Sequence, residues 1–123
     1  MFSFLKMRVT RFEYKFPEND LSELKGVCNI SAGIGIPETD SEAPVKCRIE
    51  VLFQSHTEDQ FYLKMVAVCD FSSDASYSNK DDYFKAANSE CTPIAMGKVD
   101  KLISETTEHF YGIPIKLPLD LTK

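Results

Sequence analysis

The side chains that could carry chemistry in this chain are few and lie far apart. There are two histidines, His56 and His109, and four cysteines. A metal site needs several such ligands at close spacing, and neither histidine has a second His or Cys at that spacing. His56 falls in a polar turn, and His109 falls near the end of a predicted helix, where a protonated ring suits the helix dipole. The sequence therefore favours solvated histidines over metal ligands or general bases.

The cysteines are evenly dispersed and form no Cys-x-x-Cys pair. They are Cys28, Cys47, Cys69 and Cys91. An even number leaves a disulfide framework open, but three of the four alternate with apolar residues in strand-like runs. Free cysteines behave as small apolar groups and are often buried. We therefore predict reduced, buried thiols and a cytoplasmic protein.

Motifs of nucleophilic and phosphate chemistry are missing from the sequence as well. No serine lies in a Gly-x-Ser-x-Gly context. Gly33-Ile34-Gly35 is not a phosphate loop, because no helix, third glycine or Lys-Ser/Thr follows it. Glu105 and Glu108 share a predicted helix face, as many solvated acidic pairs do. We predict that the chain is not an enzyme and uses no cofactor and no metal.

Length and charge narrow the class of protein. A chain of 123 residues suits a single domain, 1–123, that buries a real core. It has 14 basic and 19 acidic residues, a net charge of −5, and the basic residues are scattered along the sequence. Nucleic acid is not an expected partner, because phosphate binding needs clustered cations. Lys6 and Arg8 interrupt the apolar N-terminal residues too early for a signal-peptide core or a membrane span.

Four runs of alternating apolar and polar residues predict β-strands. They are Phe4–Phe16, Val27–Ile36, Val45–Ser55 and Gln60–Phe71. In the first run the apolar residues change from odd to even positions, which predicts a bulge or a bend near Thr10 and Arg11. The other three runs predict an antiparallel meander with one buried face.

The opposite face of this meander carries more apolar residues than a solvated face needs. They are Leu52, Tyr62, Val66 and Val68. An exposed apolar set of this kind marks an interface in many proteins.

The stretch Cys91–Leu121 predicts a long helix. Thr92 can cap a helix that begins at Pro93, and Gly112 suits the left-handed residue that follows its last turn. A shorter helix from Lys80 to Asn88, capped by Ser78 or Asn79, should precede it. The long helix has one apolar stripe, made of Ile94, Val99, Leu102, Ile103, Thr106 and Phe110.

This order of elements predicts an α+β fold, a four-stranded antiparallel sheet with a long C-terminal helix on one face. The helix stripe and one sheet face can cover each other, but other apolar residues are left over. They include the loop residues Phe16, Leu21 and Leu24. We expect this surplus to serve self-association and the binding of an extended or unfolded chain.

The motifs of the last third resemble those of the SecB-type protein-export chaperones. The resemblance is carried by Cys91-Thr92-Pro93-Ile94, by Ile103 with Thr106 and Thr107, and by Gly112-Ile113-Pro114-Ile115-Lys116-Leu117-Pro118. The strand Phe61–Val66 also resembles one of the family's strands, and the overall similarity spans about Leu5 to Leu121. It implies a homotetramer, built as a dimer of dimers with helices between sheets. It also implies binding of non-native polypeptide in apolar grooves without ATP.

In that family the loop after the first strand forms part of the groove. This implies that Phe16, Leu21 and Leu24 bind peptide here, although the tryptophan typical of that loop is missing. Phe61, Leu63 and Met65 are further groove candidates. For Leu63 and Met65, a place in the sheet core is the favoured alternative.

Two departures from the family concern its export motor. The strand Phe61–Cys69 contains Lys64 but no acid of the kind that the family uses to dock the motor. The chain also stops at Lys123, before the second helix of longer members. Both features favour a specific client, such as an antitoxin, over delivery to an export motor.

Two other functions stay open. One is a small-molecule-binding or catalytic α+β domain with a polar pocket around His109 or Cys69. The other is an assembly protein whose apolar back face is covered entirely by its own dimer or tetramer. No membrane partner is expected under any of the three hypotheses.

Overall fold

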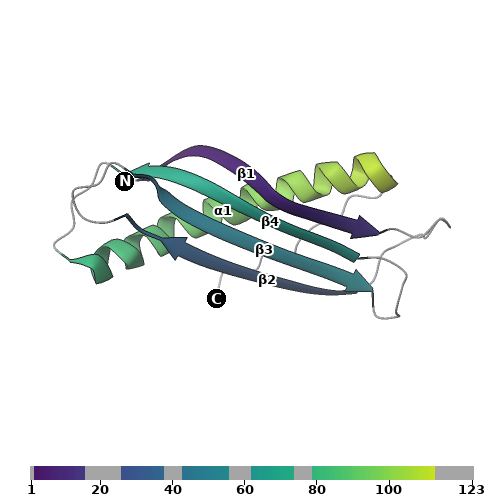
Figure 1. Ribbon diagram of the computed structural model, residues 1–123, viewed down its shortest axis with the longest axis horizontal. Helices are drawn as coiled ribbons and strands as arrows, with labels where there is room; N and C mark the ends of the chain where they lie inside the picture. The colour runs from purple at the N-terminus through teal and green to yellow at the C-terminus, as the bar shows by residue number, and fades with distance from the viewer. Residues whose placement is uncertain (1, 16–25, 38–42, 56–61, 74–78, 113–123) are drawn as a thin grey trace.

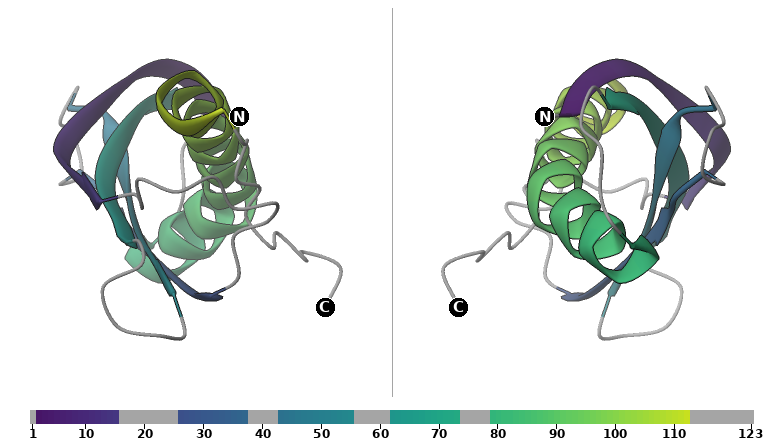
Figure 2. Two further views of the ribbon diagram at one scale, coloured as in Figure 1. Left: turned by 90° about the vertical axis from the view of Figure 1, so that its right-hand side faces the viewer. Right: turned by 90° about the vertical axis from the view of Figure 1, so that its left-hand side faces the viewer.

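The computed structural model describes residues 2–15, 26–37, 43–55, 62–73 and 79–112. These residues form β1 (Phe2–Lys15), β2 (Gly26–Gly35), β3 (Val45–Ser55), β4 (Tyr62–Ser73) and α1 (Lys80–Tyr111) (Figure 1). The strands make one antiparallel sheet in the order β1-β4-β3-β2. The helix lies along one face of the sheet, as the end-on views of Figure 2 show. This is the predicted α+β class.

Strands β2, β3 and β4 form the predicted meander, and their register is unbroken. Alternate residues of β3 and β4 point toward α1 and are fully or almost fully buried; they include Val45, Cys47, Ile49, Val51, Leu63, Met65, Ala67, Cys69 and Phe71. Period-two alternation places all of them on one face, which we call the inner face. This face and the helix together make the hydrophobic core.

Strand β1 pairs with β4 and contains two bulges. The register shifts between Phe4 and Lys6 and again between Val9 and Arg11. The second shift confirms the predicted bulge, and the first was not foreseen. Each bulge changes the parity of the inward-facing residues, because one extra residue reverses the alternation. The inner face of β1 therefore carries Phe2, Phe4, Met7, Val9, Phe12 and Tyr14.

The helix is a single element of 32 residues, so the predicted pair of helices with a start at Pro93 is wrong. Asn79 caps it as expected, since its Oδ1 accepts the backbone N–H of Asp82 at 2.8 Å. Thr92 does not cap a second helix; its hydroxyl donates to Asn88 Oδ1 at 3.1 Å. Gly112 ends the helix with φ of 86°, and its N–H donates to Glu108 O at 2.8 Å.

Tertiary packing explains why the helix continues through Pro93. A proline inside a helix costs about 3 kcal/mol, because it cannot donate to the carbonyl four residues earlier. Cys91 and Ala95, on either side of it, are fully buried against the sheet. Breaking the helix there would expose both contacts.

The buried face of α1 differs from the predicted stripe. It consists of residues four apart: Ala87, Cys91, Ala95, Val99, Ile103 and Thr107. A step of four residues turns about 40° around a helix, so this row winds around α1 as the helix crosses the twisted sheet obliquely (Figure 1). Val99 and Ile103 are buried as predicted, whereas Ile94 and Phe110 are exposed.

The face of the sheet turned away from α1, which we call the outer face, is less apolar at its surface than predicted. Val66 is buried, and Leu52 and Val68 are half-buried, whereas Tyr62 is exposed. The register partners of Val66 are Arg11 and Glu50, which stand beside it on the same face. Neighbours this close cover the small valine side chain with their own stems.

Candidate functional site

Three aromatic side chains gather where β1 and α1 end together. Phe12 and Tyr14 come from β1 and Phe110 from the last turn of α1. The rings of Tyr14 and Phe110 are stacked, with centroids 5.2 Å apart, and Phe12 lies 5.3 Å from Tyr14 and 6.4 Å from Phe110. We call Phe12, Tyr14 and Phe110 the aromatic cluster.

The second bulge of β1 places this cluster. After the register shift between Val9 and Arg11, Phe12 and Tyr14 face inward, opposite Met65 and Leu63. Without the bulge, the same two rings would point to the outer face. Phe110 meets them because α1 continues to Tyr111 before Gly112 ends it.

The cluster is only partly covered by the rest of the chain. Phe12 is half-buried, whereas Tyr14 is 47% exposed and Phe110 is 51% exposed. Stacked rings gain about 0.5–1.5 kcal/mol beyond the area that they bury, so the arrangement is held in place even at the surface. Large, pre-arranged aromatic surfaces of this kind are common anchor points in polypeptide recognition.

Further apolar residues follow the line where β1 meets α1. Along the helix, Ile94, Lys98, Leu102 and Phe110 share one row by their spacing. Two members of this row meet β1: the Lys98 ammonium lies 4.5 Å from the centroid of the Phe4 ring, and Phe110 packs on Phe12 and Tyr14. Ile94 and Val9 are exposed on this line, while Leu102 packs partly on the core. We call this line, from Ile94 and Phe4 to the aromatic cluster, the β1–α1 seam. It offers an apolar strip beside the Lys98 ammonium.

The predicted peptide-binding residues divide into two groups. Phe16, Leu21, Leu24 and Phe61 lie outside the described residues. Leu63 and Met65 are buried in the core under α1, where neither side chain reaches the surface, so the structure gives them the core role that the sequence favoured.

The aromatic cluster was not predicted from the sequence. Phe110 was assigned to the buried stripe, because helical spacing alone does not tell where a helix leaves the sheet. A signal was present, since Phe12, Tyr14 and Phe16 alternate immediately after the change of phase. The described cluster ends two residues before Phe16, the first of the predicted loop residues.

The thiols do not form a reactive site. Cys47, Cys69 and Cys91 are free and buried together between the sheet and α1, as predicted, whereas Cys28, which was also predicted to be buried, is free but only half-buried. Burial, with a smaller contribution from Cys47, raises the pKa of Cys69 and of Cys91 to about 11. Such thiols stay protonated near neutral pH and are poor nucleophiles.

Of the two histidines, only His109 lies in the part of the chain that the structure describes. His109 is exposed on the last turn of α1, with its ring 5.8 Å from that of Phe110, and His56 lies outside the described residues. Across the described ranges, no group of three or more His, Cys, Asp or Glu side chains could hold a metal ion. In the same ranges, no helix is both long enough and apolar enough to cross a membrane.

Comparison with known proteins gives a result only at the level of structure. No protein-family model and no curated protein sequence matches the chain. One similar structure is that of the SecB-like chaperone Rv1957 of Mycobacterium tuberculosis, solved in complex with a ChAD peptide from the HigA1 antitoxin Rv1956. It superposes on this chain with a TM-score of 0.68 at 10% sequence identity. The match covers 94% of this chain and 85% of that one. A Streptococcus agalactiae protein of unknown function superposes with a TM-score of 0.51 at 11% identity, covering 95% and 96%. The chain therefore has a SecB-like fold.

Proposed function

We propose that this protein is a chaperone-like module that binds non-native or extended polypeptide without ATP. The observation that carries the proposal is the aromatic cluster, in which Tyr14 and Phe110 are stacked yet about half exposed. A folded chain gains little from holding two large rings at its surface, whereas an unfolded client offers apolar side chains that the rings can bury. The SecB-like fold supports the same function.

The client is best proposed as a specific polypeptide. The structural neighbour Rv1957 was solved with a peptide from an antitoxin. We propose a client of the same kind, such as an antitoxin segment, that lies along the β1–α1 seam with aliphatic or aromatic side chains on the cluster. Loop residues Phe16, Leu21 and Leu24, which lie outside the described residues, stay predicted peptide-binding residues. Catalysis, a cofactor and a metal have no part in the proposal, and its setting is the cytoplasm.

The proposal is tested with an unfolded client and matched variants. Wild-type protein should suppress the aggregation of heat-unfolded citrate synthase, followed by light scattering, and should bind reduced, carboxymethylated α-lactalbumin. The double variant Tyr14→Ser/Phe110→Ser should bind the latter at least about tenfold more weakly, because two aromatic anchors are lost. Phe84→Ser, which removes another exposed aromatic of α1 away from the cluster, is the control and should behave as wild type. Absence of both activities in the wild type would overturn the proposal.

We further propose that the protein works as a homo-oligomer, a dimer or a tetramer. The side of α1 opposite its buried row includes Pro93 and Gly97, and a Cβ at Gly97 would meet nothing within 4 Å. Gly97→Gln should therefore be harmless in one chain and favourable for the helix, since glycine costs about 1 kcal/mol there. If two copies of the chain pack their α1 helices together between their sheets, the larger glutamine side chain should disturb this contact. The oligomer mass measured by light scattering should then fall. Unchanged mass would exclude this side of α1 as the interface.

An assembly protein without chaperone activity is the second candidate. The exposed Leu5, Val9 and Ile94 favour it, because a second copy could cover them all. In that case Tyr14→Ser/Phe110→Ser should lower the oligomer mass, and no client should bind to the wild type at any concentration.

A further inference from the structure

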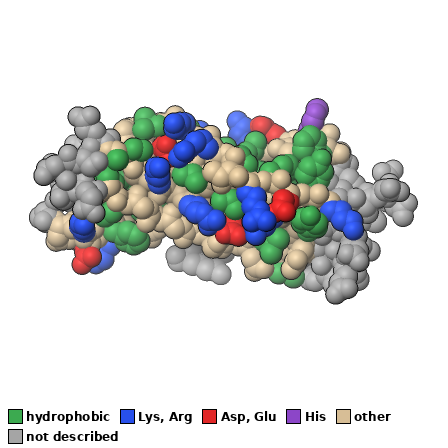
Figure 3. Space-filling view, in the orientation of Figure 1, with side chains coloured by type: hydrophobic (Ala, Val, Ile, Leu, Met, Phe, Trp, Pro, Cys, Tyr) green, Lys and Arg blue, Asp and Glu red, His purple; other side chains and the backbone are tan. Residues whose placement is uncertain are grey.

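The charged residues of the sheet are gathered on its outer face. By register, all ten charged residues of the four strands lie there, seven basic and three acidic, which gives this face a charge of +4. The whole chain carries −5, so the rest of it carries −9. Blue basic groups are spread over the middle of this face in Figure 3, with fewer red acidic groups between them.

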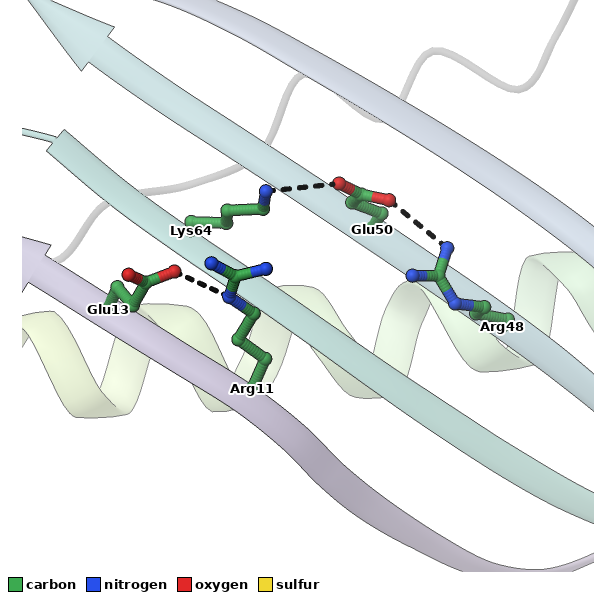
Figure 4. A network of polar contacts seen from close by, with 5 residues as sticks. All are labelled: Arg11, Glu13, Arg48, Glu50 and Lys64. Atoms are coloured by element: carbon green, nitrogen blue, oxygen red, sulfur yellow. Dashed lines mark hydrogen bonds and ion pairs between the residues drawn. The ribbon is translucent and has the colours of Figure 1, made fainter.

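The acidic side chains of this face are less exposed to solvent than most of the basic ones. Asp70, paired with Arg8 at 3.2 Å, has a side chain only 5% exposed, against 46% for the arginine. Glu50, which pairs with Arg48 at 3.1 Å and with Lys64 at 3.7 Å, is 32% exposed, against 57% for Arg48. Figure 4 shows the Arg11–Glu13 pair along β1, the Arg48–Glu50 pair along β3, and Lys64 of β4 reaching Glu50 on the neighbouring strand. An approaching molecule therefore meets positive charge first.

The excess positive charge is concentrated at one end of the face. Adjacent register rows place Lys6 and Lys46 on either side of Asp70, and Arg8 and Arg48 on either side of Val68. Lys6 and Lys46 are exposed, and within the described ranges neither takes part in an ion pair. We call Lys6, Arg8, Lys46 and Arg48 the basic quartet.

Two exposed glycines, Gly33 and Gly35, lie beside the quartet. Strand β2 continues the sheet past β3, and Gly35 and Gly33 stand opposite Lys46 and Arg48. A Cβ at Gly33 would meet nothing within 4 Å, so no crowding inside the chain demands a glycine there. The missing side chains let a partner approach the backbone next to the cations.

From these observations we infer that the outer face docks an acidic polypeptide segment of a partner protein through the basic quartet. Side chains at alternate positions of a strand are about 7 Å apart, and Lys6 and Lys46, two strands apart, are separated by about 10 Å. An extended segment with carboxylates at alternate positions has the same spacing of about 7 Å, so two of its carboxylates can meet Lys46 and Arg48 at once. Arginine also matches carboxylate geometry with two parallel hydrogen bonds.

The charge distribution favours a polypeptide over a nucleic acid. A nucleic acid carries a dense, continuous row of phosphates, which the carboxylates Glu13 and Glu50 within this face would repel. A short acidic segment presents a few discrete charges and can avoid Glu13 and Glu50. This inference is independent of the proposed client binding, because the client is proposed to lie along the β1–α1 seam and not on the outer face.

The test uses the full chain and a defined acidic peptide, (Glu-Thr)6, titrated by calorimetry at low and at physiological salt. Lys6→Glu/Lys46→Glu removes the two unpaired cations and should weaken binding by about tenfold or more, because attraction becomes repulsion. The control Lys85→Glu/Lys101→Glu changes the net charge equally but on α1, and should stay within about twofold of wild type. Added salt should weaken binding to the wild type.

Several results would overturn the inference. They are no binding of (Glu-Thr)6 to the wild type at low salt, equal weakening in both double variants, or tighter binding of the oligonucleotide dT12 than of the peptide. A wild-type oligomer that dissociates in Lys6→Glu/Lys46→Glu would make a second copy the occupant instead. If the inference holds, the same variant should still suppress citrate synthase aggregation wherever the wild type does, so the two proposals fail separately.

Discussion

The two faces of the sheet are built from alternate residues of the same strands, yet they hold opposite kinds of side chain. On the inner face the central strands place Ile49, Val51 and Phe71, fully buried under α1. On the outer face the same strands place every charged residue that they have. The difference shows how a period of two lets one stretch of sequence supply both the core and a recognition surface. The predictions below test how far the two faces differ and how well the inner face is shielded from water.

The largest loss of stability is expected on the inner face. Phe71 is fully buried, and its ring meets that of Phe4 edge to face at a centroid distance of 5.8 Å. Phe71→Ala should lower the free energy of unfolding by about 3–5 kcal/mol, because it removes the buried ring and leaves a cavity. Urea denaturation followed by circular dichroism measures this change.

Two valines provide the matched control for that comparison. Val51→Ala on the inner face and Val68→Ala on the half-buried outer face delete the same atoms. The inner substitution should cost clearly more than the outer one. Equal costs would mean that something also covers the outer face in solution.

The thiols give the second prediction. At pH 8 a pKa of about 11 in place of 9 lowers the thiolate fraction about a hundredfold, so Cys69 and Cys91 should be alkylated at least that much more slowly than an exposed thiol. Half-buried Cys28 should react first. Iodoacetamide labelling with peptide mass spectrometry measures the rates, and similar rates at Cys28 and Cys69 would contradict the buried arrangement.

The same shift fixes the direction of the pH effect on stability. Because the folded-state pKa of Cys69 and Cys91 is raised, these thiols ionise more readily in the unfolded chain. Their contribution to stability is complete below about pH 9 and is lost as the pH rises toward about 11. Serine at both positions should remove this part of the pH dependence.

The buried ion pair of the outer face should have the next largest effect. Arg8→Met leaves Asp70 almost buried without its arginine, and we expect a loss of about 1–3 kcal/mol, less than for a fully buried pair because Arg8 is half exposed. Arg8→Met/Asp70→Asn should recover most of that stability. No loss in the single variant would mean that Lys6 or Lys46 takes over the pairing.

The smallest effect is expected for the exposed pair of Arg11 and Glu13. Their side chains are 2.6 Å apart, but both are about half exposed. Glu13→Gln should therefore stay within about 0.5 kcal/mol of wild type in the same urea measurement, and salt should reduce even that difference. A loss as large as that of Arg8→Met would show that the Arg11–Glu13 pair is as well shielded from water as the Arg8–Asp70 pair.

Local sequence signals were sufficient for the four strands and for the two outer ends of the helical region. Alternation gave three strands close to their bounds, and the change of phase in the first strand located the bulge beyond Val9. The cap at Asn79 and the stop at Gly112 followed from the conformations that these residues favour. The bulge after Phe4 was not predicted, because too few residues precede it to show an alternation of apolar and polar residues.

Errors arose where distant contacts outweigh local preference. Pro93 is a strong local signal for a helix start, yet burial of Cys91 and Ala95 carries α1 through it. Likewise Phe110 has the right spacing for the core but lies where the helix passes beyond the cover of the sheet. The candidate site therefore became visible only when β1 and the end of α1 were placed together.

The sequence by itself determined the class of fold, the two-sided strands and the burial of Cys47 and Cys69 within them, since all of these follow from the pattern of apolar residues along a few turns or strand positions. Only the tertiary structure decided which residues from distant segments meet. Pairing of β1 with β4, and not with β2, brings Lys6 and Arg8 beside Lys46 and Arg48, cations that look scattered along the chain. The physical reason is that strand order and register depend on the sum of many long-range contacts, which no short window of sequence contains.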